Sequence, residues 1–215
     1  MRFVDRVEAG RQLAEKLGGL KGESDLLVLG IPRGGVVVAY EVALALDAPL
    51  DVALSRKLGA PQNEELAIGA LAENGGRILD DALIQHLRVP ADYVERITQM
   101  EMKEIERRAV MYRGQRPASD VHGRTVVVVD DGAATGATMI VTLEALRGQG
   151  ARKLIAAAPV MSGEALVRLR WIADEVVNLY VPALFLAVGG YYQNFDQVSD
   201  AEVRELLADV AGTQS

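Results

Sequence analysis

The stretch TVVVVDDGAATGAT, residues 125–138, places four consecutive valines before two aspartates and then a run of small residues. A short apolar run of this kind is typical of a strand that is buried on both faces of a parallel sheet. In an open parallel sheet, ligands bind beyond the carboxyl ends of the strands. The pattern therefore predicts a buried strand at 124–131, with Asp130 and Asp131 at a binding site.

The residues after the two aspartates indicate a site for an anion. Small side chains in GAATGAT (132–138) let the backbone approach a phosphate, and the N-terminus of a following helix adds partial positive charge. Thr135 and Thr138 add hydroxyl donors. The aspartates can accept hydrogen bonds from sugar hydroxyls, so the whole stretch favours a sugar-phosphate site. The alternative is a tightly packed turn in which one aspartate caps the helix.

Outward from this strand, apolar runs alternate with helical patterns, which indicates an α/β fold with a parallel sheet flanked by helices. The expected strands are 25–32, 50–56, 124–131, 152–160 and 174–182. The first expected helix begins after a cap near residue 5. Further helices are expected at 36–46, 136–148, 162–172 and 199–211. A single domain covering residues 1–215 is the simplest interpretation. Three segments are expected to leave the sheet: a flexible loop at about 57–76 that flanks a short strand-like piece at 66–71, a helical insertion at about 80–113 and a small C-terminal hood at about 183–198.

The composition excludes several classes of function. Half of the 215 residues are hydrophobic and 25% are charged, as in an ordinary globular protein. The absence of cysteine excludes disulfides, thiolate catalysis and cysteine metal sites. No apolar stretch is long enough to span a membrane and the start does not resemble a signal peptide, so we expect a cytoplasmic protein. The net charge of −7 argues against nucleic acid as a partner, and a phosphate ligand then needs local donors and a divalent cation.

The segment VVVVDDGAATGAT (126–138) resembles the phosphoribosyl-pyrophosphate signature of the type I phosphoribosyltransferases: four apolar residues, two acidic residues, then small residues and threonines. The resemblance implies that Asp130 and Asp131 hold the ribose hydroxyls of phosphoribosyl pyrophosphate (PRPP). It implies that the 5-phosphate binds to Ala134, Thr135, Gly136, Ala137 and Thr138. Gly132 and Ala133 depart from the family pattern, which commonly has larger aliphatic residues there. Ala134 stands where the hypoxanthine-guanine members carry an aspartate.

A second stretch, GIPRGG (30–35), resembles the pyrophosphate loop of the same family. The resemblance implies that Arg33, Gly34 and Gly35 bind the pyrophosphate, because a charged donor precedes two residues with unrestricted φ. A plain strand-to-helix turn would explain the glycines but not the arginine.

A third stretch, SRKLGAPQNEELAIGA (55–70), resembles the flexible catalytic loop of the family. Such loops close over the reaction centre, exclude water and bring in cations. Arg56 and Lys57 are then the candidate catalytic residues that stabilise the departing pyrophosphate. The structural alternative is that both are solvated charges at the end of a strand.

Residues 183–198 resemble the variable hood that covers the nucleobase in this family. Three aromatic residues, Tyr191, Tyr192 and Phe195, are concentrated there in a chain that is only 5% aromatic. An aromatic ring can stack on a planar base, so all three are candidate base-binding residues. Each could equally anchor a C-terminal loop to the core.

The resemblance implies a phosphoribosyltransferase, in which a nitrogenous base or amine attacks C1 of PRPP and pyrophosphate leaves. Mg²⁺ would be held mainly by PRPP and water, and members of the family are often homodimers. The partners would be PRPP and an unidentified base. Two alternatives remain open: a non-catalytic PRPP-binding regulatory protein, and a sugar-phosphate-binding α/β protein with other chemistry. His86 and His122 lie outside all the quoted stretches and are interpreted as incidental.

Overall fold

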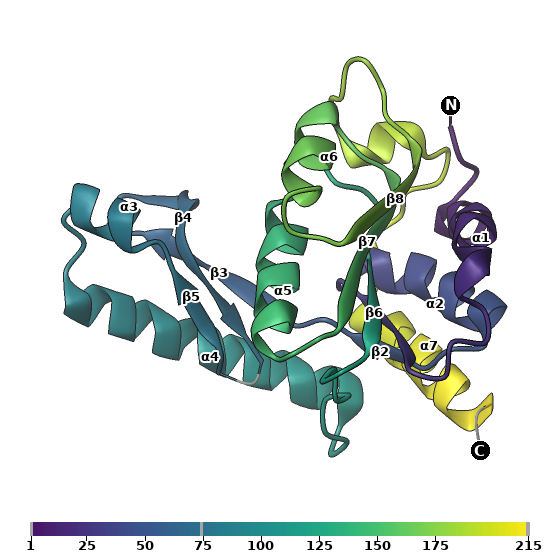
Figure 1. Ribbon diagram of the computed structural model, residues 1–215, viewed down its shortest axis with the longest axis horizontal. Coiled ribbons are helices and arrows are strands. Elements are labelled where there is room, and N and C mark those ends of the chain that lie inside the picture. The colour runs from purple at the N-terminus through teal and green to yellow at the C-terminus, as the bar shows by residue number, and fades with distance from the viewer. Residues whose placement is uncertain (1, 74, 214–215) are drawn as a thin grey trace.

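The computed structural model describes residues 2–73 and 75–213, with the side chains of all of these except 64, 65 and 211–213. Its main body contains a five-stranded parallel sheet in the order β2-β1-β6-β7-β8, flanked by helices on both faces (Figure 1). The α/β architecture predicted from the sequence is confirmed. The strands of this sheet are β1 (Leu26–Gly30), β2 (Leu50–Val52), β6 (Thr125–Val129), β7 (Lys153–Val160) and β8 (Glu175–Tyr180).

Strand β6 lies at the centre of the sheet because its β-branched valines fill both faces. Val127 and Val129 pack against α1 (Arg6–Leu17) and α2 (Gly34–Leu46) on one face. Val126 and Val128 pack on the other face against α5 (Ala137–Gly148) and α6 (Gly163–Leu169). All five residues of β6 are buried, which is why the run lacks the polar alternation of a half-exposed strand.

The remaining helices complete these two layers. On the face of Val126 lie α5 (Ala137–Gly148) and α6 (Gly163–Leu169). The last helix, α7 (Asp200–Thr213), lies beside α2 at the C-terminal end of the chain (Figure 1). Asp5 caps α1 as predicted, with its Oδ1 accepting a hydrogen bond of 2.9 Å from the backbone of Glu8. Short 3-10 turns lie at Gly18–Leu20 and Val188–Tyr191.

Residues 57–76, predicted as a loop that flanks a short strand-like piece at 66–71, are mostly strand and form the larger part of a second, antiparallel sheet. Its strands are β3 (Ser55–Ala60), β4 (Asn63–Ala72) and β5 (Arg77–Leu79). Leu58, Ile68 and Leu71 are fully buried, and they pack in the same cluster as Ile105. The prediction was wrong because these apolar residues are separated by Gly, Pro and Asn, and the surface that buries them comes from a helix more than thirty positions later.

The strand predicted at 50–56 is also divided between the two sheets. Leu50–Val52 forms β2 at the edge of the parallel sheet, and Ser55 begins β3. The segment predicted as helical, 80–113, contains α3 (Asp81–His86) and the long helix α4 (Ala91–Arg113). Together β3, β4, β5, α3 and α4 form an arm that projects from the main body (Figure 1).

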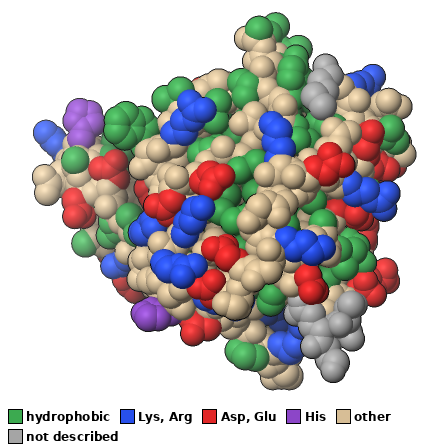
Figure 2. All heavy atoms as spheres, turned by 45° about the vertical axis from the view of Figure 1, so that its right-hand side comes forward, with side chains coloured by type: hydrophobic (Ala, Val, Ile, Leu, Met, Phe, Trp, Pro, Cys, Tyr) green, Lys and Arg blue, Asp and Glu red, His purple; other side chains and the backbone are tan. Residues whose placement is uncertain are grey.

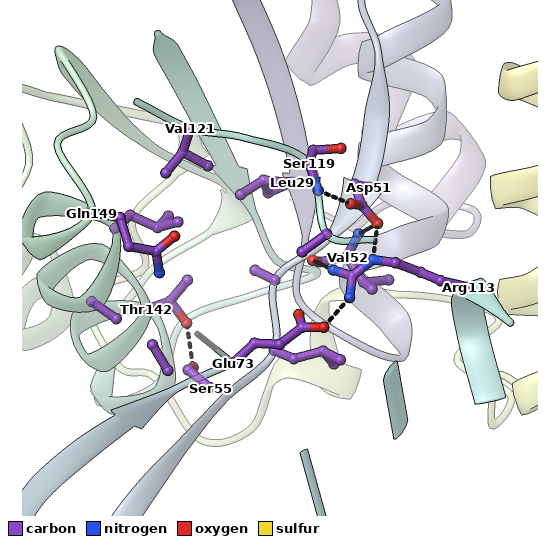
Figure 3. Close-up of a pocket in the computed structure, with 16 residues that line it drawn as sticks. Leu29, Asp51, Val52, Ser55, Glu73, Arg113, Ser119, Val121, Thr142 and Gln149 are labelled. Carbon is purple, nitrogen blue, oxygen red and sulfur yellow. Dashed lines mark hydrogen bonds and ion pairs between the residues drawn. The ribbon is translucent and has the colours of Figure 1, made fainter. Parts of the chain in front are cut away.

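Buried charges join this arm to the parallel sheet at Arg113. Its Nε donates to Oδ1 of Asp51 at 2.6 Å and its Nη2 to the carbonyl of Val52 at 2.7 Å. Its Nη1 donates to the carboxylate of Glu73 (Figure 3). A cavity of about 280 Å³ lies beside these groups, between the two sheets. The Arg113 guanidinium therefore connects the last residue of α4 to β2 and to the end of β4.

The surface carries charges of both signs. On the face that Figure 2 displays, positive and negative side chains are interspersed rather than gathered into one basic patch. Within residues 2–73 and 75–213, none of the helices is both long and apolar enough to cross a membrane.

Candidate functional site

Asp130 and Asp131 lie at the carboxyl end of β6, where the sequence predicted a binding site. The parallel register pairs Gly30 of β1 with Val129 of β6, so both chains leave the sheet at the same level. Asp130 Oδ1 accepts a hydrogen bond of 2.8 Å from the backbone N–H of Asp131. Both residues are half-buried. The acidic pair is therefore next to the segment that follows β1.

Asp131 is held from two other parts of the chain. The Nε of Arg6, on α1, donates to Oδ2 of Asp131 at 2.8 Å, and both side chains are largely buried, with 11% and 15% exposed. The Tyr192 hydroxyl donates to the Asp131 carbonyl at 2.5 Å. Both the backbone and the carboxylate of Asp131 are thus held by other side chains of the protein.

The environment makes both carboxyls harder to ionise. Burial raises the pKa of Asp130 well above its ordinary value, and the neighbouring charge of Asp131 raises it further. Burial also raises the pKa of Asp131, although the Arg6 guanidinium opposes that change. Because the two groups interact closely, they titrate as a pair. The pair retains a proton to higher pH than isolated carboxyls would.

Gly34 and Gly35 bring the first turn of α2 into direct contact with the acidic pair. A Cβ atom at position 34 would overlap Oδ2 of Asp131. A Cβ atom at position 35 would lie 2.7 Å from the carbonyl oxygen of Val129 and 2.8 Å from Cα of Asp130. Only glycine permits this approach, so the two stretches assigned to ribose and pyrophosphate are contiguous in space.

The Arg33 side chain turns to a different neighbour. The peptide bond between Pro32 and Arg33 is cis. The guanidinium Nη1 lies 3.9 Å from Oδ1 of Asp200 at the start of α7, and the side chain is 37% exposed. The structure therefore brings the backbone of 33–35 to the acidic pair, and leaves the Arg33 guanidinium at the edge of the site.

Residues 134–138 form the turn into α5, as the sequence predicted. Gly136 has φ of 70° and immediately precedes the helix, in a conformation that few other residues adopt. Ala134, Thr135, Ala137 and Thr138 are exposed. This exposed helix N-terminus follows the acidic pair directly, which is the arrangement required for a phosphate next to a sugar.

Arg56 and Lys57 lie on β3 rather than on an open loop. The Arg56 Nε is 2.5 Å from Oε2 of Glu101 on α4, so its guanidinium is bound within the arm. Lys57 is half-buried opposite Ala70 of β4. The Arg56 guanidinium is thus held by α4, and its role in catalysis stays a prediction.

Tyr192 was wrongly predicted to be a base-binding residue. Its side chain is only 1% exposed, and its ring lies against Phe3, with 5.5 Å between centroids, and against Phe195 at 5.0 Å. A ring enclosed in this way cannot stack on a base, and its hydroxyl instead holds Asp131. Sequence alone did not reveal the burial, because Phe3 is so distant in the chain.

The other two candidate base-binding residues of the hood remain accessible in part. Tyr191 is half-buried between Phe185 and Tyr180, and its hydroxyl donates to the carbonyl of Leu184 at 3.0 Å. Phe195 is 36% exposed, and the Arg6 guanidinium lies 3.8 Å from its ring centroid. Both stay candidates for contact with a base.

Three residues of the site were missed by the sequence analysis: Arg6, Ser162 and Arg168. The Ser162 hydroxyl donates to the carbonyl of Ala134 at 2.5 Å, and Arg168 Nη1 donates to the carbonyl of Thr135 at 3.0 Å. These contacts hold the backbone of the turn 134–138. No local motif marks any of the three residues, because Arg6 reaches the site from the start of α1, and Ser162 and Arg168 reach it from the N-cap and the last turn of α6.

The acidic pair offers oxygen donors of the kind that a magnesium ion prefers. Among the residues that the structure describes, no group of three or more His, Asp or Glu side chains could hold a metal ion. Asp130 and Asp131 offer hard oxygen donors, but Asp131 is already bound to Arg6.

The chain is similar to known proteins over most of its length. The family model described as the phosphoribosyl transferase domain matches residues 4–181. A protein of Mycobacterium tuberculosis (strain ATCC 25618 / H37Rv), provisionally named a phosphoribosyl transferase, is 46% identical over 205 residues. The match covers 95% of this chain and 46% of that protein, so the chain spans about half the length of this curated relative.

Two further matches differ in extent. The crystal structure of TT1426 from Thermus thermophilus is 46% identical, with a TM-score of 0.89, and the match covers 97% of this chain and 99% of that chain. A ribose-phosphate pyrophosphokinase of Marinomonas sp. (strain MWYL1) is 41% identical over 61 residues, which are 27% of this chain and 19% of that protein.

Proposed function

The chain belongs to the phosphoribosyl transferase domain family, and we propose that it transfers the phosphoribosyl group of PRPP to a nitrogenous base or amine. Pyrophosphate is the leaving group. The observation that carries the proposal is the contact of Gly34 and Gly35 with the acidic pair, immediately before the exposed turn 134–138. Sites suited to a pyrophosphate, a ribose diol and a phosphate adjoin one another in the order in which PRPP presents these groups.

Each part of the site has a role in this reaction. Asp130 and Asp131 accept hydrogen bonds from the ribose hydroxyls, and the backbone of 134–138 binds the 5-phosphate at the start of α5. The backbone of 33–35 binds the pyrophosphate. The protein holds C1 in place for attack, and this positioning lowers the barrier without a covalent intermediate on the protein.

Magnesium completes the charge balance of the proposed site. When bound, Mg²⁺ neutralises part of the charge on the departing pyrophosphate. Asp130 and Asp131 are the residues that would approach it, directly or through water. The net charge of −7 makes this cation more important, because the protein as a whole repels a polyanionic ligand.

One observation favours a second candidate function, a non-catalytic regulator that binds PRPP. The Arg56 guanidinium is bound to Glu101 on α4, so a cation assigned to catalysis has a partner elsewhere. A regulator needs the phosphate, ribose and pyrophosphate sites but does not need a cation that acts on the leaving group. The two functions share a ligand and differ in turnover.

The test is an assay of pyrophosphate release from PRPP and Mg²⁺, with purine bases, pyrimidine bases and simple amines supplied one at a time. Release that depends on one acceptor supports the transferase. Binding of PRPP without release for any acceptor supports the regulator. Absence of both binding and release rejects both functions.

A further inference from the structure

The first residues of the chain form a strap along the hood. We define the N-terminal strap as residues 2–6 and keep the hood as 183–198. The backbone N–H of Phe3 donates to the carbonyl of Tyr191 at 2.8 Å. The N–H groups of Gln193 and Asn194 donate back to the carbonyls of Phe3 and Val4, at 2.8 and 2.9 Å. The two segments are therefore bound to each other along several consecutive residues.

Arg6 extends this strap to the acidic pair. Its Nε donates to Oδ2 of Asp131, and its Nη1 donates to the carbonyl of Asp196 at 2.9 Å. The same guanidinium lies over the ring of Phe195. One side chain, with 11% of its surface exposed, thus contacts the candidate ribose site and two residues of the hood.

The charge of Arg6 matters because its surroundings are acidic. The titratable groups that face the Asp131 carboxylate are Asp130 at the end of β6, Arg6 from α1 and Tyr192 from the hood. Helix α2 contributes only Gly34 at this contact. Arg6 is consequently the cation that balances the two carboxylates, and it does so with a planar group that also binds a carbonyl.

We propose that Arg6 is a positioning residue of the PRPP site, which fixes the Asp131 carboxylate and couples it to the docking of the hood. This inference rests on the proposed function, because it assigns Arg6 to the site for PRPP. The ribose hydroxyls meet a carboxylate already oriented by Arg6, and loss of this guanidinium disturbs both the ribose site and the hood.

The experiment compares Arg6→Gln and Arg6→Lys with Arg11→Gln. Arg11 lies on the same helix and forms an ion pair with Glu41, but its side chain is 70% exposed and is not part of the hood contacts described above. Calorimetric titration with PRPP and Mg²⁺ is run for each protein between pH 5 and 9. Hydrogen exchange of the Gln193 and Asn194 amides is measured without ligand.

Arg6→Gln is expected to weaken PRPP binding by at least about tenfold, and Arg11→Gln by less than about twofold. The pH at which binding is half-maximal should rise in Arg6→Gln, since the Asp131 carboxyl loses its counter-charge. Arg6→Lys keeps a cation at this position and should restore most of the affinity for PRPP. The hood amides should exchange faster in Arg6→Gln alone. A role limited to folding would not move the pH midpoint.

The inference is overturned if Arg6→Gln binds PRPP with the affinity and pH midpoint of Arg11→Gln. Failure of the unaltered protein to bind PRPP rejects the proposed function, and with it the assignment of Arg6 to a PRPP site. In that case hydrogen exchange of the hood amides still tests whether Arg6 couples the Asp131 carboxylate to the docking of the hood. Faster exchange in Arg6→Gln supports it, and equal exchange in both variants rejects it.

Discussion

The backbone of Gly34 lies so close to the carboxylate of Asp131 that a Cβ atom at position 34 would overlap Oδ2 of Asp131. The same oxygen accepts the hydrogen bond from Arg6. This contact joins the segment after β1 to the segment after β6. The central strands of the sheet therefore supply two adjacent walls of one site.

Gly34→Ala is expected to abolish tight PRPP binding with little loss of stability, because the new methyl group displaces the end of a side chain. Gly35→Ala should lower the free energy of unfolding by about 1–3 kcal/mol, because its methyl group meets backbone atoms of Val129 and Asp130. Gly148→Ala is the control, since nothing lies within 4 Å of its Cβ position. Calorimetry and urea denaturation check the three variants, and normal PRPP affinity in Gly34→Ala would contradict the contact.

Asp130→Asn should stabilise the protein at pH 7 by about 1 kcal/mol and remove PRPP binding. The folded-state pKa of Asp130 is raised, so the folded protein holds this proton more tightly than the unfolded chain does. Stability then falls as pH rises from about 4 through the raised pKa. The asparagine avoids this loss and can still accept the hydrogen bond from Asp131.

The measurement for Asp130→Asn is urea denaturation at pH 4 and pH 7. The difference in unfolding free energy between the variant and the unaltered protein should be small at pH 4 and should grow toward pH 7. A variant that is less stable at pH 7 would show that the carboxylate charge stabilises the fold.

Arg56→Ala is expected to lower kcat more than it raises KM, if the arginine acts on the departing pyrophosphate. Arg77→Ala is a matched control, because Arg77 also pairs with a glutamate of α4, Glu95, from another strand of the arm. The comparison requires steady-state kinetics with the acceptor that supports turnover. Equal effects of the two substitutions would show that Arg56 only ties β3 to α4. Lys57→Ala should behave like Arg56→Ala.

Arg113→Met should lower the free energy of unfolding by about 3–5 kcal/mol, because it leaves the carboxylate of Asp51 buried without its cation. Arg107→Met on the same helix should leave the urea midpoint nearly unchanged, since Arg107 is 60% exposed. A small effect of Arg113→Met in the same measurement would show that the charges at the junction of the two sheets contribute little.

The parts of the fold that could be predicted from the sequence are those with a local signal. The valines of β6 specify a strand buried on both faces, and the small residues after Asp131 indicate the turn into α5. The glycines at 34 and 35 and the acidic pair each had a local signal too, although the contact between them did not. Their contact with the acidic pair followed from the parallel pairing of β1 with β6.

The contributions that could not be predicted come from distant parts of the chain. Arg6 lies 125 positions from Asp131, and nothing in the residues around it distinguishes it from other surface arginines. Tyr192 was a candidate for contact with a base because the local sequence did not reveal its burial, which depends on contacts with Phe3 and Phe195. Of the hairpin of β3 and β4, only a strand-like piece at 66–71 was predicted, because the apolar residues of the hairpin are buried by α4 and show no clear local pattern.

The most direct test of a PRPP site at the acidic pair is calorimetric titration with PRPP, with and without Mg²⁺. The unaltered protein and Asp131→Asn are titrated in the same way. The asparagine keeps an oxygen acceptor for Arg6 but removes the carboxylate charge. We predict Mg²⁺-dependent binding by the unaltered protein, weakened at least about tenfold in the variant. Absence of binding with Mg²⁺, or equal affinity of the two proteins, would contradict a PRPP site at the acidic pair.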